Sequence, residues 1–243
     1  MEIAEYVAHL EEDGSRLAEA ADRAGWDATV PELQWDVRAL VTHTGGVHRW
    51  AADIVATASS TTDTELGRAV GQGPEDDALL DWFTAGHAAL VATLRAAPAD
   101  LQCATFLAAP SPLAFWARRQ AHETAIHRAD AEGAAGAVTP FDTLFAQDGI
   151  GELLRGFAAR KSHAIARTAM VSLNSTDGPS WLVTLGGERI TAEEGGDTDS
   201  DLTVGGTSSD IYLWLWNRPS GVTLEGDATL ADDWANSVRV RWS

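Results

Sequence analysis

The segment HETAIHRAD, residues 122–130, combines two histidines and a carboxylate at spacings that could bind a metal ion. Two histidines four residues apart on a helix form part of a common zinc site, because that spacing puts both imidazoles on one face. Here His122 and His127 are five residues apart, so their directions differ by about 140° around a helix of about 3.6 residues per turn. Glu123 and His127 are four residues apart and differ by only about 40°. The spacing therefore favours Glu123 and His127 as a ligand pair.

Several polar side chains share the face of this predicted helix that carries Glu123. The residues that point within about 60° of it are Trp116, Arg119, Ile126, His127 and Asp130. Burying such charges costs several kcal/mol for each one left unpaired. They must therefore pair with one another, bind a metal or line a wet cavity. One interpretation is a salt-bridge network, such as Arg119 with Glu123 or Asp130; the other is a metal site.

A catalytic zinc site needs a further ligand, because such sites use three protein ligands and keep one position open. This ligand must come from another helix. His43 and His48 both lie in the segment WDVRALVTHTGGVHRWAADIV. They flank its predicted buried face on opposite sides, so periodicity does not choose between them, and each could also be an ordinary core or surface histidine. The remaining candidates are His9, His87 and His163.

The elements that carry these residues are predicted to be helices. Apolar residues recur at helical spacing from Ile3 to about Arg167, which indicates four or five helices. Beyond Met170 the pattern changes to short strand-like runs at residues 180–187, 189–194, 201–206 and 222–227, with helical pieces at 208–218 and 228–238. We therefore predict a helical domain, residues 1–166, and a small α+β domain with a mainly antiparallel sheet, residues 167–243.

Composition restricts the class of function. The chain has 243 residues, 17 Lys plus Arg and 36 Asp plus Glu, and a formal charge of -19. This charge repels nucleic acid and anionic membranes, so neither is an expected partner. The sequence shows no leader and no apolar run that could cross a bilayer, which predicts a cytoplasmic protein. Cys103 is the single cysteine; an internal disulfide is therefore excluded.

Tryptophan is frequent, with ten in the chain. Trp35, Trp50, Trp116, Trp214 and Trp216 lie in or beside the segments discussed here. They could form an aromatic wall for an apolar electrophile, although core packing is the more usual role of such residues.

Three blocks of the sequence resemble the hallmark blocks of the mycothiol-dependent maleylpyruvate isomerase family. They occur in the same order, nearly span the chain, and read WDVRALVTHTGGVHRWA, FWARRQAHETAIHRADAE and DLTVGGTSSDIYLWLWNRPSGVTLEGDATLADDW. The resemblance implies a DinB-like N-terminal four-helix bundle that holds a divalent metal, usually zinc, and a sterol-carrier-like C-terminal domain. It also implies that the metal ligands are His43, Glu123 and His127.

The resemblance further implies that Arg218 reaches the active site, although an arginine before Pro219 could also interact with the last carbonyls of a helix. We expect Arg119 and Arg218 to hold carboxylates of the thiol or the substrate. Asp130 could instead orient a ligand of the metal.

The expected activity is that of a mycothiol S-transferase, in which a metal-bound thiolate attacks an electrophilic small molecule. The alternatives are a cis-trans isomerase of the maleylpyruvate type, a hydrolase that uses metal-bound water, and a non-catalytic metal- or small-molecule-binding protein. Mycothiol and a small-molecule electrophile are the expected partners, the source is expected to be actinobacterial, and the chain is expected to be a monomer or a weak homodimer.

Overall fold

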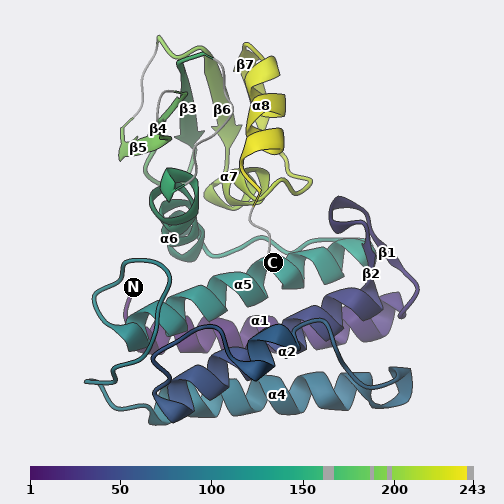
Figure 1. Cartoon of the computed structure of the whole chain (residues 1–243). Helices are drawn as coiled ribbons and strands as arrows, with labels where there is room; N and C mark the ends of the chain where they lie inside the picture. The colour runs from purple at the N-terminus through teal and green to yellow at the C-terminus, as the bar shows by residue number, and fades with distance from the viewer. Residues whose placement is uncertain (161–166, 187–188, 196–198, 240–243) are drawn as a thin grey trace. The chain divides into compact units, whose positions relative to one another are not determined.

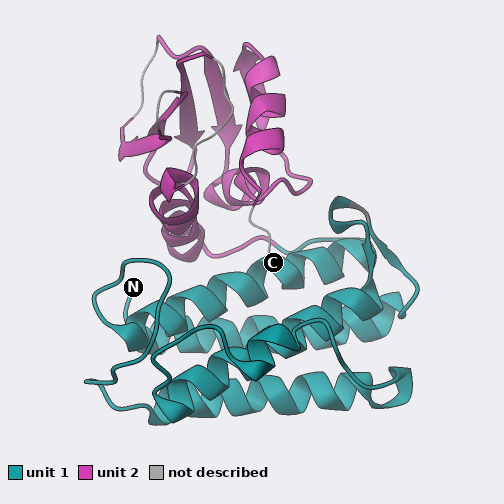
Figure 2. Cartoon of the chain, in the orientation of Figure 1, with its two compact units in different colours: residues 1–139 teal, residues 140–243 magenta. Residues whose placement is uncertain are grey.

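The computed structural model describes residues 1–160, 167–186, 189–195 and 199–239. The chain divides into two compact units, Met1–Thr139 (unit 1) and Pro140–Ser243 (unit 2), which are coloured separately in Figure 2. The predicted boundary between residues 166 and 167 borders a segment outside the described residues. The observed division comes earlier, because helix α6 (Thr143–Glu152) packs against α7 (Ser208–Leu215) inside unit 2.

Four long helices make up most of the described part of unit 1 (Figure 1). They are α1 (Ile3–Ala24), α2 (Val37–Thr57), α4 (Asp76–Ala96) and α5 (Pro112–Ala134). Helix α1 packs mainly against α5, and α2 packs mainly against α4, while α1 with α4 and α2 with α5 make further contacts. The shorter elements are β1 (Thr29–Val30), η1 (Pro31–Leu33), β2 (Trp35–Asp36) and α3 (Glu65–Arg68).

The helices that carry the candidate ligands begin at well-defined caps. The Asp36 carboxylate accepts a hydrogen bond from the backbone N–H of Ala39 at 2.7 Å and so caps α2. The Ser111 hydroxyl accepts one from the backbone N–H of Ala114 at 3.1 Å, and Pro112 occupies the first turn of α5. These caps fix where each helix starts and therefore which way its side chains point.

Apolar side chains from α1, α2 and α4 form a buried core in unit 1. Leu17, Leu40, Leu79 and Phe83 are each 0% exposed in this cluster. Burial of a side chain of this size stabilises a fold by roughly 1.5–3 kcal/mol. In α5, by contrast, every residue from Arg119 to Glu132 is buried, polar residues included. The charged residues of α5 therefore need partners inside the protein.

Unit 2 contains a sheet with helices packed beside it. Within the described residues the sheet has five strands in the order β5-β4-β3-β6-β7, and only β3 with β6 is a parallel pair. The strands are β3 (Ala169–Ser175), β4 (Trp181–Leu185), β5 (Thr191–Glu194), β6 (Leu202–Gly206) and β7 (Thr223–Gly226). The other elements are η2 (Leu153–Phe157), η3 (Ala158–Arg160) and α8 (Thr229–Ser237).

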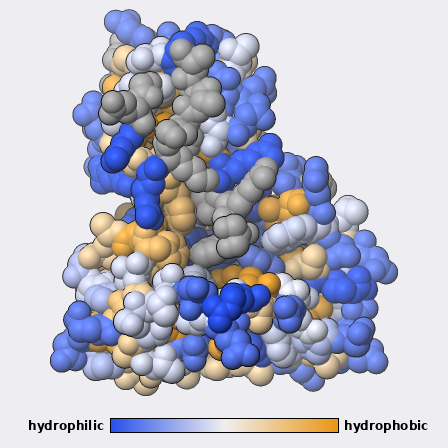
Figure 3. All heavy atoms as spheres, viewed as in Figure 1, coloured by the Kyte–Doolittle hydropathy of each residue, from blue (hydrophilic) through white to orange (hydrophobic). Residues whose placement is uncertain are grey.

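The predicted organisation, a helical part followed by a unit with a mainly antiparallel sheet, is confirmed. Hydrophilic side chains cover much of the visible face of unit 2 (Figure 3), in keeping with the excess of 36 acidic over 17 basic residues. Among the helices that the structure describes, none has both the length and the apolar character needed to span a bilayer.

Candidate metal centre

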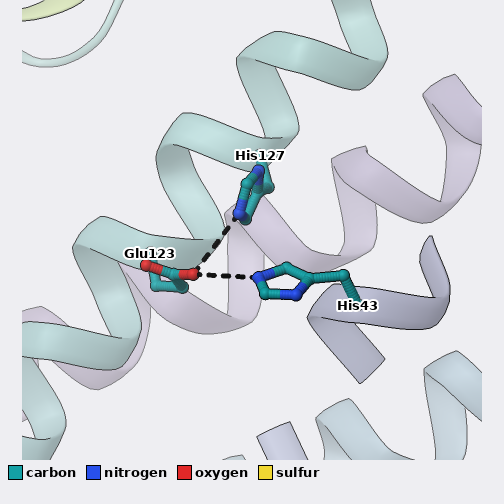
Figure 4. Close-up of side chains that lie close together, drawn as sticks. All are labelled: His43, Glu123 and His127. Carbon is teal, nitrogen blue, oxygen red and sulfur yellow. Dashed lines mark ion pairs between the residues drawn. The ribbon is translucent and has the colours of Figure 1, made fainter. Parts of the chain in front are cut away.

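Helices α2 and α5 bring three candidate ligands together (Figure 4). His43 projects from α2 toward Glu123 and His127 on α5. The Glu123 Oε1 atom lies 3.3 Å from His127 Nε2 and 3.5 Å from His43 Nε2. One ligand atom from each residue lies within 4.8 Å of the other two, and all three residues are buried. The spacing of four residues places Glu123 and His127 on one face of α5, where both approach His43.

The arrangement fits a divalent metal. His43 Nε2 and Glu123 Oε1 are both buried and have no hydrogen-bond partner within the described structure. A buried polar atom without a partner is costly, so these two atoms call for a cation between them. Ligands at the zinc distance of about 2.0–2.1 Å are about 3.3 Å apart in a tetrahedron. The separations of 3.3 and 3.5 Å match that value.

His43 and His48, the two candidate ligands on α2, have different surroundings in the structure. The His48 ring is 0% exposed, and its Nε2 atom is 2.8 Å from the Thr124 hydroxyl. It is not a member of the ligand group found among the described residues. His122 likewise points elsewhere, with its ring edge-on to Tyr6 at 6.2 Å. Of the other candidates, His9 and His87 are outside the group, and His163 lies outside the described residues.

Two charged side chains, Arg119 and Asp130, contact the candidate ligands and orient them. The Arg119 guanidinium donates a hydrogen bond to Glu123 Oε2 at 3.2 Å, which leaves Oε1 facing the histidines. The Asp130 carboxylate is 2.9 Å from His127 Nδ1. A carboxylate on this nitrogen keeps it protonated and directs the other nitrogen toward a metal. The salt-bridge and metal interpretations of α5 therefore describe parts of one arrangement.

The negative charges of Glu123 and Asp130 favour a cation beside the candidate ligands. Burial alone would raise the pKa of Glu123, but the nearby His127 and His43 side chains and the Arg119 charge hold it well below its ordinary value. Burial lowers the pKa of His127, yet the hydrogen bond with Asp130 and the charges of Asp130 and Glu123 outweigh this and raise it to about 9. In the metal-free site the carboxylates thus retain a proton on His127, which a bound metal would displace.

Comparison with known proteins decides the family. Residues 7–132 match the mycothiol maleylpyruvate isomerase N-terminal domain, and residues 145–233 match the MDMPI C-terminal domain. The chain belongs to the mycothiol-dependent maleylpyruvate isomerase family. Membership places it among mycothiol-dependent enzymes of the isomerase or transferase type. No curated protein matches this sequence.

Solved structures of the maleylpyruvate isomerase family share the fold. A mycothiol-dependent maleylpyruvate isomerase is 16% identical, with 93% of each chain covered and a TM-score of 0.66. A histidine-to-alanine mutant of a mycothiol-dependent maleylpyruvate isomerase is also 16% identical over 93% of each chain, with a TM-score of 0.65. At this identity the likeness concerns the arrangement of helices and strands.

Arg218 belongs to unit 2 and lies three residues after Leu215, the last residue of α7. Its Nη1 atom donates to the backbone carbonyl of Trp216 at 2.8 Å. This contact with a carbonyl at the helix end is the ordinary role that the sequence also allowed for this arginine. Its contact with substrate, like that of Arg119, stays a prediction within the maleylpyruvate isomerase family.

Cys103 is not suited to act as the nucleophile of this enzyme. The residue is partly buried, and burial raises the pKa of its thiol. A raised pKa reduces the fraction of reactive thiolate at neutral pH. An external thiol such as that of a family cosubstrate is therefore required for sulfur chemistry.

Two buried histidines outside the candidate ligand group, His48 and His87, predict sensitivity to acid. Burial lowers the pKa of His48 well below its ordinary value, and burial also lowers that of His87. At neutral pH burial thus favours the neutral form of both rings in the folded protein, whereas the unfolded chain takes up protons at about pH 6.5. The free energy of unfolding is therefore greatest above that pH and decreases as the pH falls toward the folded pKa values.

We expect His48→Gln to make the free energy of unfolding less dependent on pH, by about 1 kcal/mol per pH unit just below pH 6.5. The glutamine stays neutral and can still hydrogen-bond Thr124, the partner of His48. Urea unfolding of both proteins at several pH values measures the two slopes. Equal slopes would contradict the assignment of a neutral, buried His48.

Proposed function

We propose that the chain is a metal-dependent, mycothiol-dependent isomerase that converts a cis double bond of a maleylpyruvate-type acid to the trans form. In this proposal zinc is held by His43, Glu123 and His127, inside a DinB-like four-helix bundle formed by α1, α2, α4 and α5. The observation that carries the proposal is the pair of buried, unpartnered atoms, His43 Nε2 and Glu123 Oε1, that face each other across 3.5 Å.

Three protein ligands leave room for one more, which is the arrangement of catalytic zinc sites. A divalent metal bound there would keep a coordinated thiol deprotonated, whereas a free thiol with a pKa of about 8.5 is only a few per cent thiolate at neutral pH. Burial of the three ligands, with His43 at 7%, Glu123 at 3% and His127 at 6% exposure, keeps most water away from this position. Dry surroundings strengthen the electrostatic interactions within the site.

The chain's own charged groups hold the ligands in one geometry. Arg119 fixes Glu123 through Oε2, and Asp130 fixes His127 through Nδ1. Because both supporting side chains lie on α5 with the ligands they orient, the pair is ready before the thiol arrives. We further propose that Arg218, in the sterol-carrier-like C-terminal domain, binds a carboxylate of the substrate.

The isomerase alternative is favoured over the transferase expected from the sequence. The family matched along the chain is described by its maleylpyruvate isomerase activity. In isomerisation, a thiolate sulfur adds to one carbon of the double bond and the π electrons move onto the conjugated carbonyl. The remaining single bond rotates, the electrons return to form the trans double bond, and the C–S bond breaks so that the thiolate leaves with its electron pair. A transferase shares the first step but retains the sulfur in its product. Whether the thiol is consumed therefore distinguishes the two.

The test is to mix zinc-loaded protein with maleylpyruvate and mycothiol and to follow both compounds by chromatography. We expect the trans product to accumulate over many turnovers while the amount of free mycothiol stays constant. Loss of mycothiol in proportion to the formation of an S-conjugate would replace the isomerase by the transferase. If the protein neither turned over the substrate nor bound the thiol, the enzyme proposals would fail together.

A further inference from the structure

The short hairpin between α1 and α2 places an indole against both histidine ligands. The Trp35 ring centroid lies 5.0 Å from that of His43, with the planes tilted by 52°. It lies 6.3 Å from that of His127, with the planes 29° apart and stacked. One aromatic side chain thus contacts ligands that come from two different helices.

The position of this indole is fixed by the backbone around it. Trp35 pairs with Val30 across the two-stranded β1–β2 sheet. Gln34, just before it, has a φ of 57°, the left-handed conformation that turns the chain. Asp36, just after it, caps α2. The indole also packs against the core cluster of unit 1. It is therefore held in place before any small molecule binds.

Trp35 differs in exposure from the other side chains that border the ligands. Arg119 is 0% exposed and Asp130 is 7% exposed, and both are engaged with the ligands. Trp35 has intermediate exposure. Among these three neighbours, the indole has the most surface to offer a molecule that enters the site.

We propose that the Trp35 indole binds the flat, unsaturated carbon chain of the electrophile beside the metal centre; this inference rests on the proposed function. The electron-rich face of an indole attracts a planar π-system, and offset stacking adds to the gain from burial. A conjugated cis acid is planar along its double bond, whereas the thiol adduct has a tetrahedral carbon and stacks less well. The indole therefore favours the bound substrate over the adduct, so its loss should raise KM more than it lowers kcat.

The experiment compares Trp35→Leu and Trp35→Phe with the wild type, all loaded with zinc. We expect Trp35→Leu to raise KM for maleylpyruvate about tenfold, with kcat changed by less than about threefold. Trp35→Phe should recover most of the loss, because it restores a planar ring. Binding of maleylpyruvate without thiol, measured by calorimetry, should weaken in Trp35→Leu by about the same factor, and this readout needs no turnover.

Trp26→Leu is the matched control. Trp26 is also partly buried against the same core cluster, so its replacement tests for general damage to unit 1. We expect it to leave zinc content, substrate affinity and KM unchanged. Unchanged substrate affinity and KM in Trp35→Leu would overturn the inference, and so would loss of zinc from that variant, which would assign the indole to supporting the ligands. A wild type that neither binds nor converts maleylpyruvate would instead overturn the proposed function.

Discussion

Replacing Glu123 by alanine or glutamine is expected to abolish metal retention. Its Oε1 atom faces both histidine ligands, at 3.3 Å from His127 and 3.5 Å from His43. Changes to residues that only orient a ligand typically lower metal affinity by about 10–100-fold. Loss of a ligand itself should exceed that range and remove turnover with it. Metal analysis of the purified proteins, followed by competition with a chelator of known affinity, measures the effect.

The matched control is His122→Ala, which changes the residue next to Glu123. Its ring contacts Tyr6 rather than the ligand group, so the variant should retain its metal. The glutamine variant of Glu123 guards against misfolding, because its side-chain oxygen can still accept from the buried Arg119. If His122→Ala lost the metal while Glu123→Ala kept it, the geometric assignment of the ligands on α5 would be wrong.

Replacing Arg128 by methionine is expected to destabilise the protein by about 3–5 kcal/mol, the usual result of leaving buried charges without their partner. The Arg128 guanidinium donates to Asp13 at 3.0 Å, to Glu132 at 2.8 Å and to the Thr139 carbonyl at 2.6 Å. Side-chain exposures of 2% for Arg128, 8% for Asp13 and 5% for Glu132 leave little water to take its place. Urea unfolding followed by circular dichroism measures the loss.

Arg38→Met provides the comparison for this effect. Arg38 also bridges carboxylates, with Asp76 at 2.5 Å and Asp27 at 3.1 Å, but its side chain is 37% exposed. Exposed ion pairs contribute about 0–1 kcal/mol. A similar loss of stability in both variants would show that burial does not set the strength of the Arg128 cluster.

Part of the candidate metal centre could be predicted from the sequence because it lies on one helix. Helical spacing gives the angle between two side chains, and Glu123 with His127 needs nothing more. Periodicity does not choose between His43 and His48; the resemblance to the family favoured His43, and the packing of α2 places His43 beside Glu123. Both residues are buried, and both approach α5, His43 beside Glu123 and His48 at the Thr124 hydroxyl. Periodicity reveals that a face is buried but not which neighbour covers it.

In unit 2, too, the sequence pattern predicts only part of the structure. The strand-like runs predicted at residues 180–187, 189–194, 201–206 and 222–227 correspond to β4, β5, β6 and β7. The central strand, β3 (Ala169–Ser175), is not among the predicted runs. Its run AMVSLNS contains serines and an asparagine, and its parallel pairing with β6 depends on residues distant in sequence. Helical elements continue past unit 1 as α6, η2 and η3, so a change from helices to strands does not mark the end of that unit.

The most direct test of the central claim is zinc X-ray absorption of the loaded protein before and after mycothiol is added. We predict about one zinc per chain, bound by nitrogen and oxygen ligands at about 2.0–2.1 Å, with a sulfur at about 2.3 Å when the thiol is present. Because Cys103 lies outside the ligand group of the described residues, that sulfur must come from mycothiol. A zinc spectrum that gained no sulfur ligand, or a protein that retained no metal, would contradict the account.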